Sequence, residues 1–195
     1  MLTRKIFLLL ASWLVISAAA FAAGENYEGK DLKEKDFSGQ NLTGANFSDA
    51  TVKSCRFANA VLNKANFEDA DLRLSSFYKA TAQEANFKGV ILALGTSFGS
   101  ADFQNSIFTG VNFAGITLEN VNFRGADLRN TTGYGSGTNI NFRGADLRGA
   151  NLSGLSYSSP RQYWNLQFKG AKYDNKTVFP KDTDPKAEGA VLVEE

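Results

Sequence analysis

Histidine is absent from this chain of 195 residues, cysteine occurs once, and proline occurs only 3 times. Without an imidazole, the chain lacks the commonest general base, the usual activator of serine and cysteine nucleophiles, and a frequent metal ligand. The single cysteine, Cys55, excludes an intramolecular disulfide and a zinc site built from clustered cysteines. We therefore expect a protein that is not an enzyme and that holds neither a cofactor nor a metal.

An excess of charge of one sign is also lacking, with 21 Lys and Arg against 20 Asp and Glu and a formal net charge of +1. A strongly basic chain would indicate binding to nucleic acid, and this balance gives no reason to expect such a partner. Phenylalanine and glycine are abundant instead, with 16 and 18 residues. The chain is long enough for one domain with a sizeable core, so the placement of the phenylalanines is the main question.

Residues 1–22 have the features of an export signal. Arg4 and Lys5 precede an apolar run over residues 6–20, which ends in the small-x-small pattern of residues 20–22. We expect cleavage after Ala22 on the general secretory route, because Lys5 stands where a twin-arginine signal has its second arginine. The alternative is an uncleaved membrane anchor, since the run is nearly long enough to span a bilayer. No second hydrophobic span follows, so we expect no transmembrane segment in the mature chain.

Beyond the signal, a large apolar residue recurs at every fifth position. These repeat centres are Leu32, Phe37, Leu42, Phe47, Val52, Phe57, Leu62, Phe67, Leu72, Phe77, Ala82, Phe87 and Leu92, then Phe98, Phe103, Phe108, Phe113, Leu118, Phe123 and Leu128, and finally Phe142, Leu147 and Leu152. One extra residue near Gly95 and a polar stretch at 130–139 interrupt the series.

A second, mostly small residue lies two positions before each centre, as Ala145 does before Leu147. Asp or Asn usually stands between the two, and Gly often follows two positions after the centre. A five-residue step advances about 140° around an α-helix, so it forms no stripe there. Residues five apart lie on opposite faces of a strand. The period therefore indicates a solenoid whose chain turns a corner after each unit.

These tandem units, of the form Ala-(Asp/Asn)-(Leu/Phe)-x-x over residues 30–155, resemble the pentapeptide repeat family. The resemblance implies an all-β fold, a right-handed quadrilateral β-helix with four units per coil and inward-pointing centres. Phe and non-Phe centres alternate from Phe37 to Leu92. In that geometry, phenylalanines occupy two opposite sides of the coil, and residues such as Phe47 and Phe67 stack in one column.

Three regions are expected: the signal peptide at 1–22, the repeat solenoid at 23–157, and final repeats with a C-terminal cap at 158–195. Within the solenoid, the Gly-rich residues 130–139 are expected to bulge from one coil as an insert. This insert is either a tolerated surface loop or a partner-contact loop with Tyr134 at its tip.

Both ends of the solenoid need a cover. At the first coil, Lys30, Lys35 and Gln40 stand where small inward residues belong, so we expect a polar and imperfect coil. At the other end, a short helix is expected over residues 161–165, followed by further units and an otherwise irregular cap. Residues 191–193 are candidates to pair with the last coil.

Candidate functional residues lie around the expected insert. Arg124, Arg129, Arg143 and Arg148 each follow a repeat centre and are expected to point outward. Together with Tyr134, they form a candidate site for an unknown protein partner. The alternative is a solvated face whose charge is balanced by neighbouring aspartates.

The remaining reactive groups have simpler interpretations. The Asp and Asn residues between inward positions are assigned to hydrogen bonds at turns rather than to metal binding or catalysis. Cys55 occupies an inward position and is expected to be a buried structural thiol.

These observations favour an exported, non-enzymatic structural or protein-interaction scaffold in a bacterial periplasm or a thylakoid lumen. The resemblance implies the same, since exported members with a capped C-terminus are common in cyanobacteria. The alternative is a gyrase-interacting DNA mimic, the best understood activity of the family. That mechanism requires a strongly acidic rod in the cytoplasm, which the balanced charge and the export signal disfavour.

Overall fold

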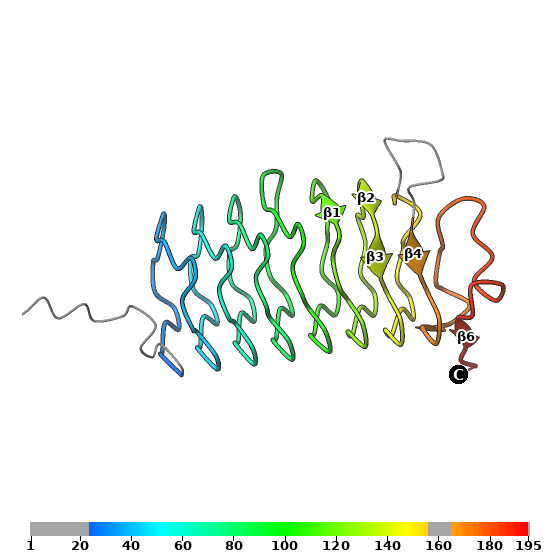
Figure 1. Cartoon of the computed structure of the whole chain (residues 1–195), viewed down its shortest axis with the longest axis horizontal. Coiled ribbons are helices and arrows are strands. Elements are labelled where there is room, and N and C mark those ends of the chain that lie inside the picture. The colour runs from blue at the N-terminus through cyan, green and yellow to red at the C-terminus, as the bar shows by residue number, and fades with distance from the viewer. Residues whose placement is uncertain (1–23, 156–164, 195) are drawn as a thin grey trace, which may run out of the picture.

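The computed structural model describes residues 24–155 and 165–194, which form a rod of stacked coils (Figure 1). Parallel backbone bridges join each coil to the next, as they join Asn46 to Asn66, 20 positions on. Each regular coil therefore consists of four five-residue units. The handedness and the quadrilateral cross-section of the coil stay predictions. The predicted signal peptide and the predicted helix, except for Asn165, lie outside the described residues.

Each unit is built from one bridge and one turn, as the unit around Phe47 shows. Asn46 is bridged to its neighbour coils, and the ring of Phe47 is fully buried. The N–H of Ala50 then donates to the carbonyl of Phe47 at 3.1 Å and closes a turn in which Asp49 has a φ of 56°. A positive φ at the third turn position is typical of type II turns and favours glycine. This explains why glycine recurs two residues after the centre.

The Asp and Asn residues between the inward positions make the turn hydrogen bonds that we expected. Oδ1 of Asn46 accepts the backbone N–H of Ser48 at 3.1 Å. The same side chains also form a ladder along the rod, because Nδ2 of Asn66 donates to Asn46 at 3.2 Å and Nδ2 of Asn86 donates to Asn66 at 3.0 Å. Their polar groups are therefore used within the fold.

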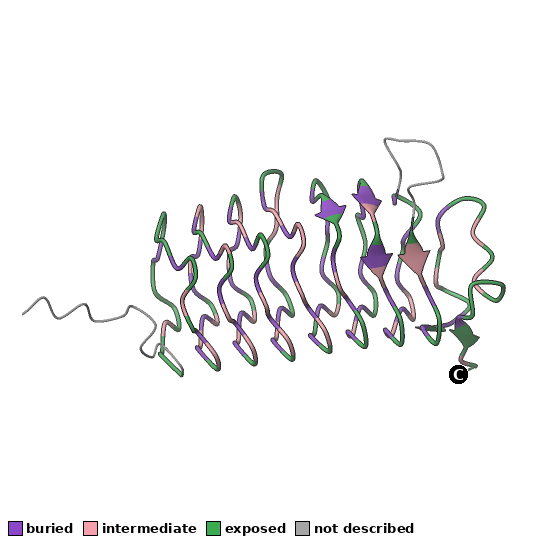
Figure 2. Ribbon diagram, viewed as in Figure 1, coloured by how far each residue is buried: buried purple, intermediate pink, exposed green. Residues whose placement is uncertain are grey.

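The repeat centres form the core, and buried residues recur along every coil in Figure 2. Every predicted centre is buried except Leu92, which is only partly buried. Leu92 lies in the coil that contains the extra residue, where Ser76 is bridged to Ser97 rather than to a residue 20 positions on. Thr96 is buried there, and its hydroxyl donates to the carbonyl of Leu72 at 3.2 Å.

From Phe37 to Phe87 the phenylalanines pack in two columns, as predicted. Within a column the rings are stacked, with centroids 4.6 Å apart for Phe47 and Phe67 and 4.8 Å apart for Phe57 and Phe77. Between the columns the rings meet edge to face, as Phe57 and Phe67 do at 5.8 Å. Both arrangements are favourable for aromatic quadrupoles, so alternation along the sequence becomes two interlocked columns inside the rod.

The strands are short and lie in the later coils, and the described residues contain no helix. All three pairs are parallel: β1 (Leu118–Glu119) with β2 (Gly137–Thr138), β3 (Ile140–Asn141) with β4 (Leu166–Gln167), and β5 (Lys172–Tyr173) with β6 (Val191–Leu192). The last pair confirms the predicted pairing of the C-terminal segment with the final coil.

The expectation that residues 130–139 bulge from a coil is wrong. Thr132 is bridged to Asn112, and Gly137 and Thr138 form β2, which pairs with β1 of the preceding coil. Asn141 lies only 19 positions after its ladder partner Asn122. The segment is therefore two sides of a coil that is one residue shorter than a regular coil, and its glycines allow the backbone to follow the neighbouring coil closely.

The N-terminal coil is polar, as expected. Nζ of Lys30 donates to the carbonyl of Asn26 at 2.7 Å, and Nε2 of Gln40 donates to the carbonyl of Asp36 at 3.2 Å. Tyr27 covers this end of the phenylalanine columns, with its ring stacked on Phe47 at a centroid distance of 4.7 Å and edge to face with Phe37 at 5.6 Å. Long polar side chains thus replace the small inward residues only where no coil lies outside them.

Candidate functional site

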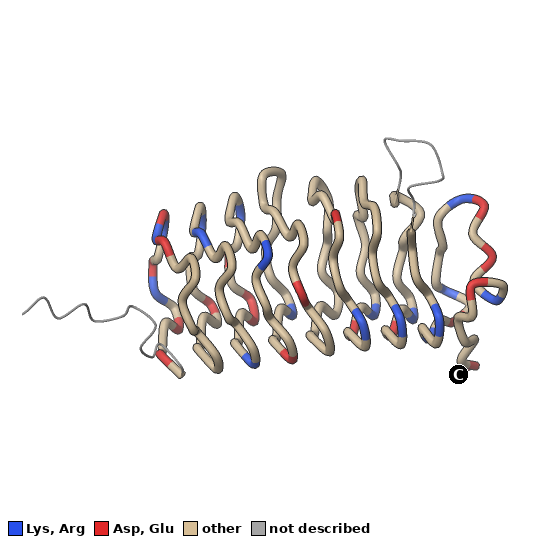
Figure 3. Tube along the Cα trace, viewed as in Figure 1, with Lys and Arg blue, Asp and Glu red and all other residues tan. Residues whose placement is uncertain are grey.

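Positively charged residues lie along one edge of the last coils of the rod, where Figure 3 shows Lys and Arg positions on successive turns. The four predicted arginines belong to this region, and we refer to it as the basic face. It consists of Arg124, Arg129, Arg143, Arg148 and Lys169. The structure divides these side chains into two groups that differ in their partners.

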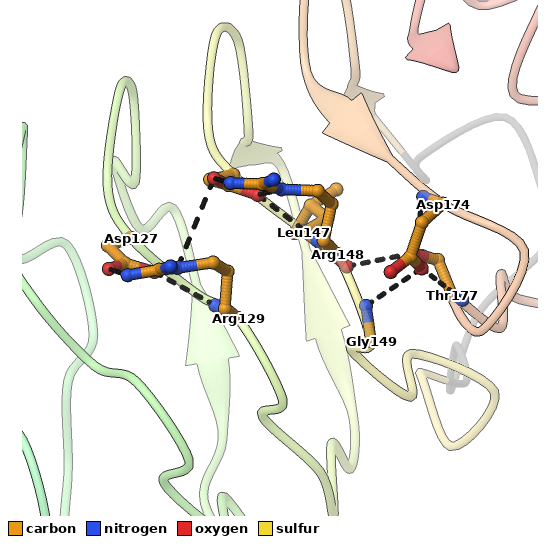
Figure 4. Close-up of polar contacts among 8 residues, drawn as sticks. Asp127, Arg129, Leu147, Arg148, Gly149, Asp174 and Thr177 are labelled. Carbon is orange, nitrogen blue, oxygen red and sulfur yellow. Dashed lines mark hydrogen bonds and ion pairs between the residues drawn. The ribbon is translucent and has the colours of Figure 1, made fainter. Parts of the chain in front are cut away.

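Arg129 and Arg148 are held by carboxylates of their own units. Nε and Nη2 of Arg129 donate to Asp127 at 2.9 and 2.6 Å, and the same atoms of Arg148 donate to Asp146 at 2.9 and 2.6 Å. Arg129 also lies 4.0 Å from Asp146 on the next coil (Figure 4). Bidentate pairs of this kind orient both side chains, so these two arginines add little net positive charge to the surface.

The pKa values of Asp127 and Asp146 reflect these bidentate pairs. Partial burial by itself raises the pKa of Asp127 and of Asp146. The hydrogen bonds from Arg129 and Arg148 outweigh that effect, and the net shift of both pKa values is downward. Both aspartates are therefore ionised at neutral pH, and the interpretation of a face balanced by aspartates holds for this part of the basic face.

Arg124 and Arg143 differ, because no ion pair within the described ranges involves either side chain. The N–H of Gly125 donates to the carbonyl of Arg143 at 2.9 Å, and the N–H of Gly144 donates to the carbonyl of Lys169 at 3.1 Å. These bonds place Arg124, Arg143 and Lys169 in register on three successive coils. We call these three residues the cation row.

The cation row borders a shallow open groove. The groove has a volume of about 670 Å³ and is lined by Arg124, Asn141, Arg143, Gly144, Lys169 and Gly170. Each cation is followed by a glycine, and a Cβ at Gly144 would meet no atom within 4 Å. Because glycine has no side chain, the backbone at the bottom of the groove is exposed there, and a ligand backbone can approach the row closely.

The alternative of a partner-contact loop placed Tyr134 at its tip, and that placement is wrong. Its side chain is buried, its ring stacks on Phe113, and its hydroxyl lies 2.8 Å from that of Thr131. Burial raises the pKa of Tyr134. Tyr134 is a core residue and lies inside the coil, away from the basic face.

Asp174 closes the same end of the rod, a role that the sequence analysis missed. Its carboxylate accepts the N–H of Gly149 at 2.9 Å, and Oγ1 of Thr177 lies 2.8 Å from it and 3.0 Å from the carbonyl of Leu147 (Figure 4). A side chain here replaces the backbone partners that another coil would supply. Lys169 was missed as well, although Lys169-Gly170 follows Phe168 as Arg143-Gly144 follows Phe142.

Groups that would support other chemistry are engaged in the fold. Cys55 is buried, its thiol donates to the carbonyl of Leu32 at 2.8 Å, and burial raises its pKa. Within residues 24–155 and 165–194, no cluster of Cys, Asp and Glu is arranged to hold a metal ion. In the same ranges, no helix has the length and hydrophobicity to cross a membrane.

A comparison with solved structures found matches. They include trypsin-treated QnrB1, described as a plasmid-mediated fluoroquinolone resistance protein (23% identity, 88% of this chain, 83% of that chain, TM-score 0.48). A second is HetL from Nostoc sp. strain PCC 7120, a protein involved in heterocyst differentiation regulation (16%, 90% and 88%, TM-score 0.28). A third is AT2G44920 from the Arabidopsis thaliana thylakoid lumen (27%, 66% and 69%, TM-score 0.21).

A search of curated proteins found no match. The family described as pentapeptide repeats does match, with 8 copies over residues 31–57, 55–92, 96–132 and 138–156. These ranges cover most of the described coils, and they leave out residues 133–137, which include Tyr134. On this evidence the chain belongs to the pentapeptide repeat family.

Proposed function

We propose that the chain is an exported, non-enzymatic scaffold that presents the outward sides of a right-handed quadrilateral β-helix to a protein partner. The observation that carries this proposal is the contrast, within the basic face, between cations that are ion-paired and cations that are not. Arg129 and Arg148 are neutralised by their own units, whereas Arg124, Arg143 and Lys169 have no carboxylate partner among the described residues. A rigid rod with one uncompensated row of charge is suited to binding rather than to catalysis.

The rigidity of the rod supports a binding role. Side chains such as Asn66 are fixed by hydrogen bonds to both neighbouring coils, and the centres beneath them are fully buried. A preorganised surface loses little conformational entropy when a partner binds. The buried, protonated thiol of Cys55 offers no nucleophile that would favour an enzyme instead.

The surface charges favour this scaffold over a gyrase-interacting DNA mimic. A mimic of DNA needs rows of carboxylates that remain available to a DNA-binding protein. Here the carboxylates of Glu68, Asp71, Asp127 and Asp146 all lie within ion-pair distance of lysines or arginines. Among the described residues from Leu118 to Tyr173, Lys and Arg outnumber Asp and Glu, which is the opposite of the required charge.

Export is tested on the N-terminal segment. We expect a fusion of residues 1–30 to a reporter to reach the periplasm or the lumen, and the N-terminus of the mature full chain to begin at Ala23 by mass spectrometry. The matched control is the same fusion with Leu9→Arg and Leu14→Arg, which interrupts the apolar run and is expected to stay in the cytoplasm. Cytoplasmic retention of the unaltered fusion would contradict export and return the gyrase alternative to consideration.

A further inference from the structure

The cation row has the dimensions of a site for an extended chain. Its three cations lie on adjacent coils, and neighbouring coils of a β-solenoid are about 4.8 Å apart. The row therefore runs parallel to the rod axis over about 10 Å, whereas three alternate side chains of an extended peptide span about 14 Å. Alternate side chains of such a peptide point to the same face, about 7 Å apart, within reach of flexible Arg and Lys side chains.

The row is one side chain wide, which restricts what can bind. On the same coils, Arg129 and Arg148 are forked with Asp127 and Asp146, whose side chains are 25% and 20% exposed. A duplex nucleic acid or a membrane surface would extend over these ion pairs and gain little from them. A single extended strand contacts the cation row alone.

The lining of the groove favours a peptide over a single-stranded nucleic acid. Proteins that bind single strands combine a positive groove with aromatic side chains on which the bases stack. Among the residues that the structure describes, none of those that line the groove beside Arg143 is aromatic. Asn141 lines it instead. One N–H of its amide donates to Asn122 at 2.9 Å, which leaves the second for a peptide carbonyl. Gly144 and Gly170 allow a main chain to lie close to the floor.

We propose that Arg124, Arg143 and Lys169 bind an extended acidic segment of a partner protein, which lies along the rod axis with alternate carboxylates on the three cations. The choice of a protein partner rests on the proposed function. The inference that the cation row binds an acidic ligand does not rest on the proposed function, because it follows from the ion pairs and the register of the last coils.

The test is a titration of the full chain with a fluorescein-labelled peptide of alternating Glu and Ser, eight residues long, measured by anisotropy at low ionic strength. The triple variant Arg124→Gln, Arg143→Gln, Lys169→Gln is expected to bind it about tenfold or more weakly. The matched control, Lys35→Gln, Lys64→Gln, Lys79→Gln, removes the same charge from exposed positions of other coils and is expected to bind with unchanged affinity.

Three other probes make the result decisive: a Lys-Ser peptide, a single-stranded oligonucleotide and vesicles of anionic phospholipid. Equal losses in both triple variants would overturn the proposal, because net charge rather than the row would then govern binding. Tighter row-dependent binding of the oligonucleotide or the vesicles would overturn it too, in favour of a phosphate ligand. If the peptide does not bind, the proposal that the cation row is a peptide site is wrong. The proposals of export and of a scaffold function would still stand, because separate experiments test them.

Discussion

The ring of Tyr134 lies against the ring of Phe113, with centroids 4.9 Å apart and planes inclined by 28°. Phe113 is a repeat centre, so Tyr134 takes the place of a centre in the next coil. Its hydroxyl remains satisfied in the core, because it lies 2.8 Å from Oγ1 of Thr131, which is itself 2.6 Å from the carbonyl of Leu128. A polar aromatic residue thus continues a column that the sequence pattern interrupts.

Removal of this ring should destabilise the rod. We expect Tyr134→Ala to lower the free energy of unfolding by about 3–5 kcal/mol, because it leaves a cavity beside Phe113. Tyr134→Phe keeps the ring and should cost only about 1 kcal/mol, since Thr131 keeps its bond to Leu128. Urea denaturation followed by circular dichroism measures both. Equal stability of Tyr134→Ala and the unaltered chain would contradict the core placement.

The Phe columns predict a second set of stability changes. Phe67 stacks on Phe47 and Phe87 and meets Phe57 and Phe77 edge to face. Phe67→Ala is therefore expected to cost about 3–5 kcal/mol, and Phe67→Leu less, because Leu fills more of the space.

The matched control for Phe67 is exposed Tyr78, whose replacement by Ser removes an aromatic ring without opening a cavity. Its effect on the free energy of unfolding, measured by urea denaturation, is expected to be within about 0.5 kcal/mol. Similar losses at Tyr78 and Phe67 would argue that the columns are not the source of stability.

Acidification should weaken the C-terminal closure at Asp174. Burial alone raises the pKa of Asp174, but the N–H of Gly149 and the hydroxyl of Thr177 lower it overall. A carboxylate whose pKa is lower in the folded state stabilises the fold above its unfolded pKa of about 3.9 and loses that contribution as the pH falls through the folded value. We expect stability to decline below about pH 4–5, with a smaller decline in Asp174→Asn.

Denaturation midpoints measured from pH 7 to pH 3 decide this prediction. Asn175→Ala serves as the control, because it alters an exposed neighbouring residue and leaves the carboxylate in place. It should show the same acid dependence as the unaltered chain. An acid dependence in Asp174→Asn as steep as that of the unaltered chain would count against the role of Asp174.

The two groups of arginines should respond differently to neutralisation. Arg148→Gln breaks the fork with Asp146 and is expected to lower stability by up to about 1 kcal/mol, the usual range for an exposed pair. Arg124→Gln removes no ion pair among the described residues and should be close to neutral. High salt should reduce the difference between the two variants in thermal denaturation, and a larger loss for Arg124→Gln would contradict the assignment.

The regular coils could be predicted from sequence because every unit repeats the same local rule. The inward pair and the turn recur from Phe47 to Phe87, and the residue between the inward pair is polar in each of these units except at Val61. One correct unit therefore defines the rest. Alternation of Phe and aliphatic centres then predicted the columns, which tertiary contacts such as Phe47 on Phe67 confirm.

The remaining features depend on alignment between coils, which one sequence does not show. Tyr134 is displaced by one residue from the expected register, so its segment appeared to be an insert. Lys169 follows residues 156–164, and only its bond partner Gly144 reveals that it continues the row of Arg143. Asp174 looks like an ordinary surface aspartate until its contact with Gly149 is seen.

The backbone bridges that join successive coils have a mechanical consequence. Bonds such as Phe47 N–H to the carbonyl of Asn66, at 2.6 Å, point along the rod rather than across it. Tension applied to the two ends therefore acts along these hydrogen bonds. The bonds between two coils are expected to break one after another, rather than all together as they would under shear. The rod resists compression and bending through its filled interior, but under stretching it should peel apart coil by coil, beginning at an end.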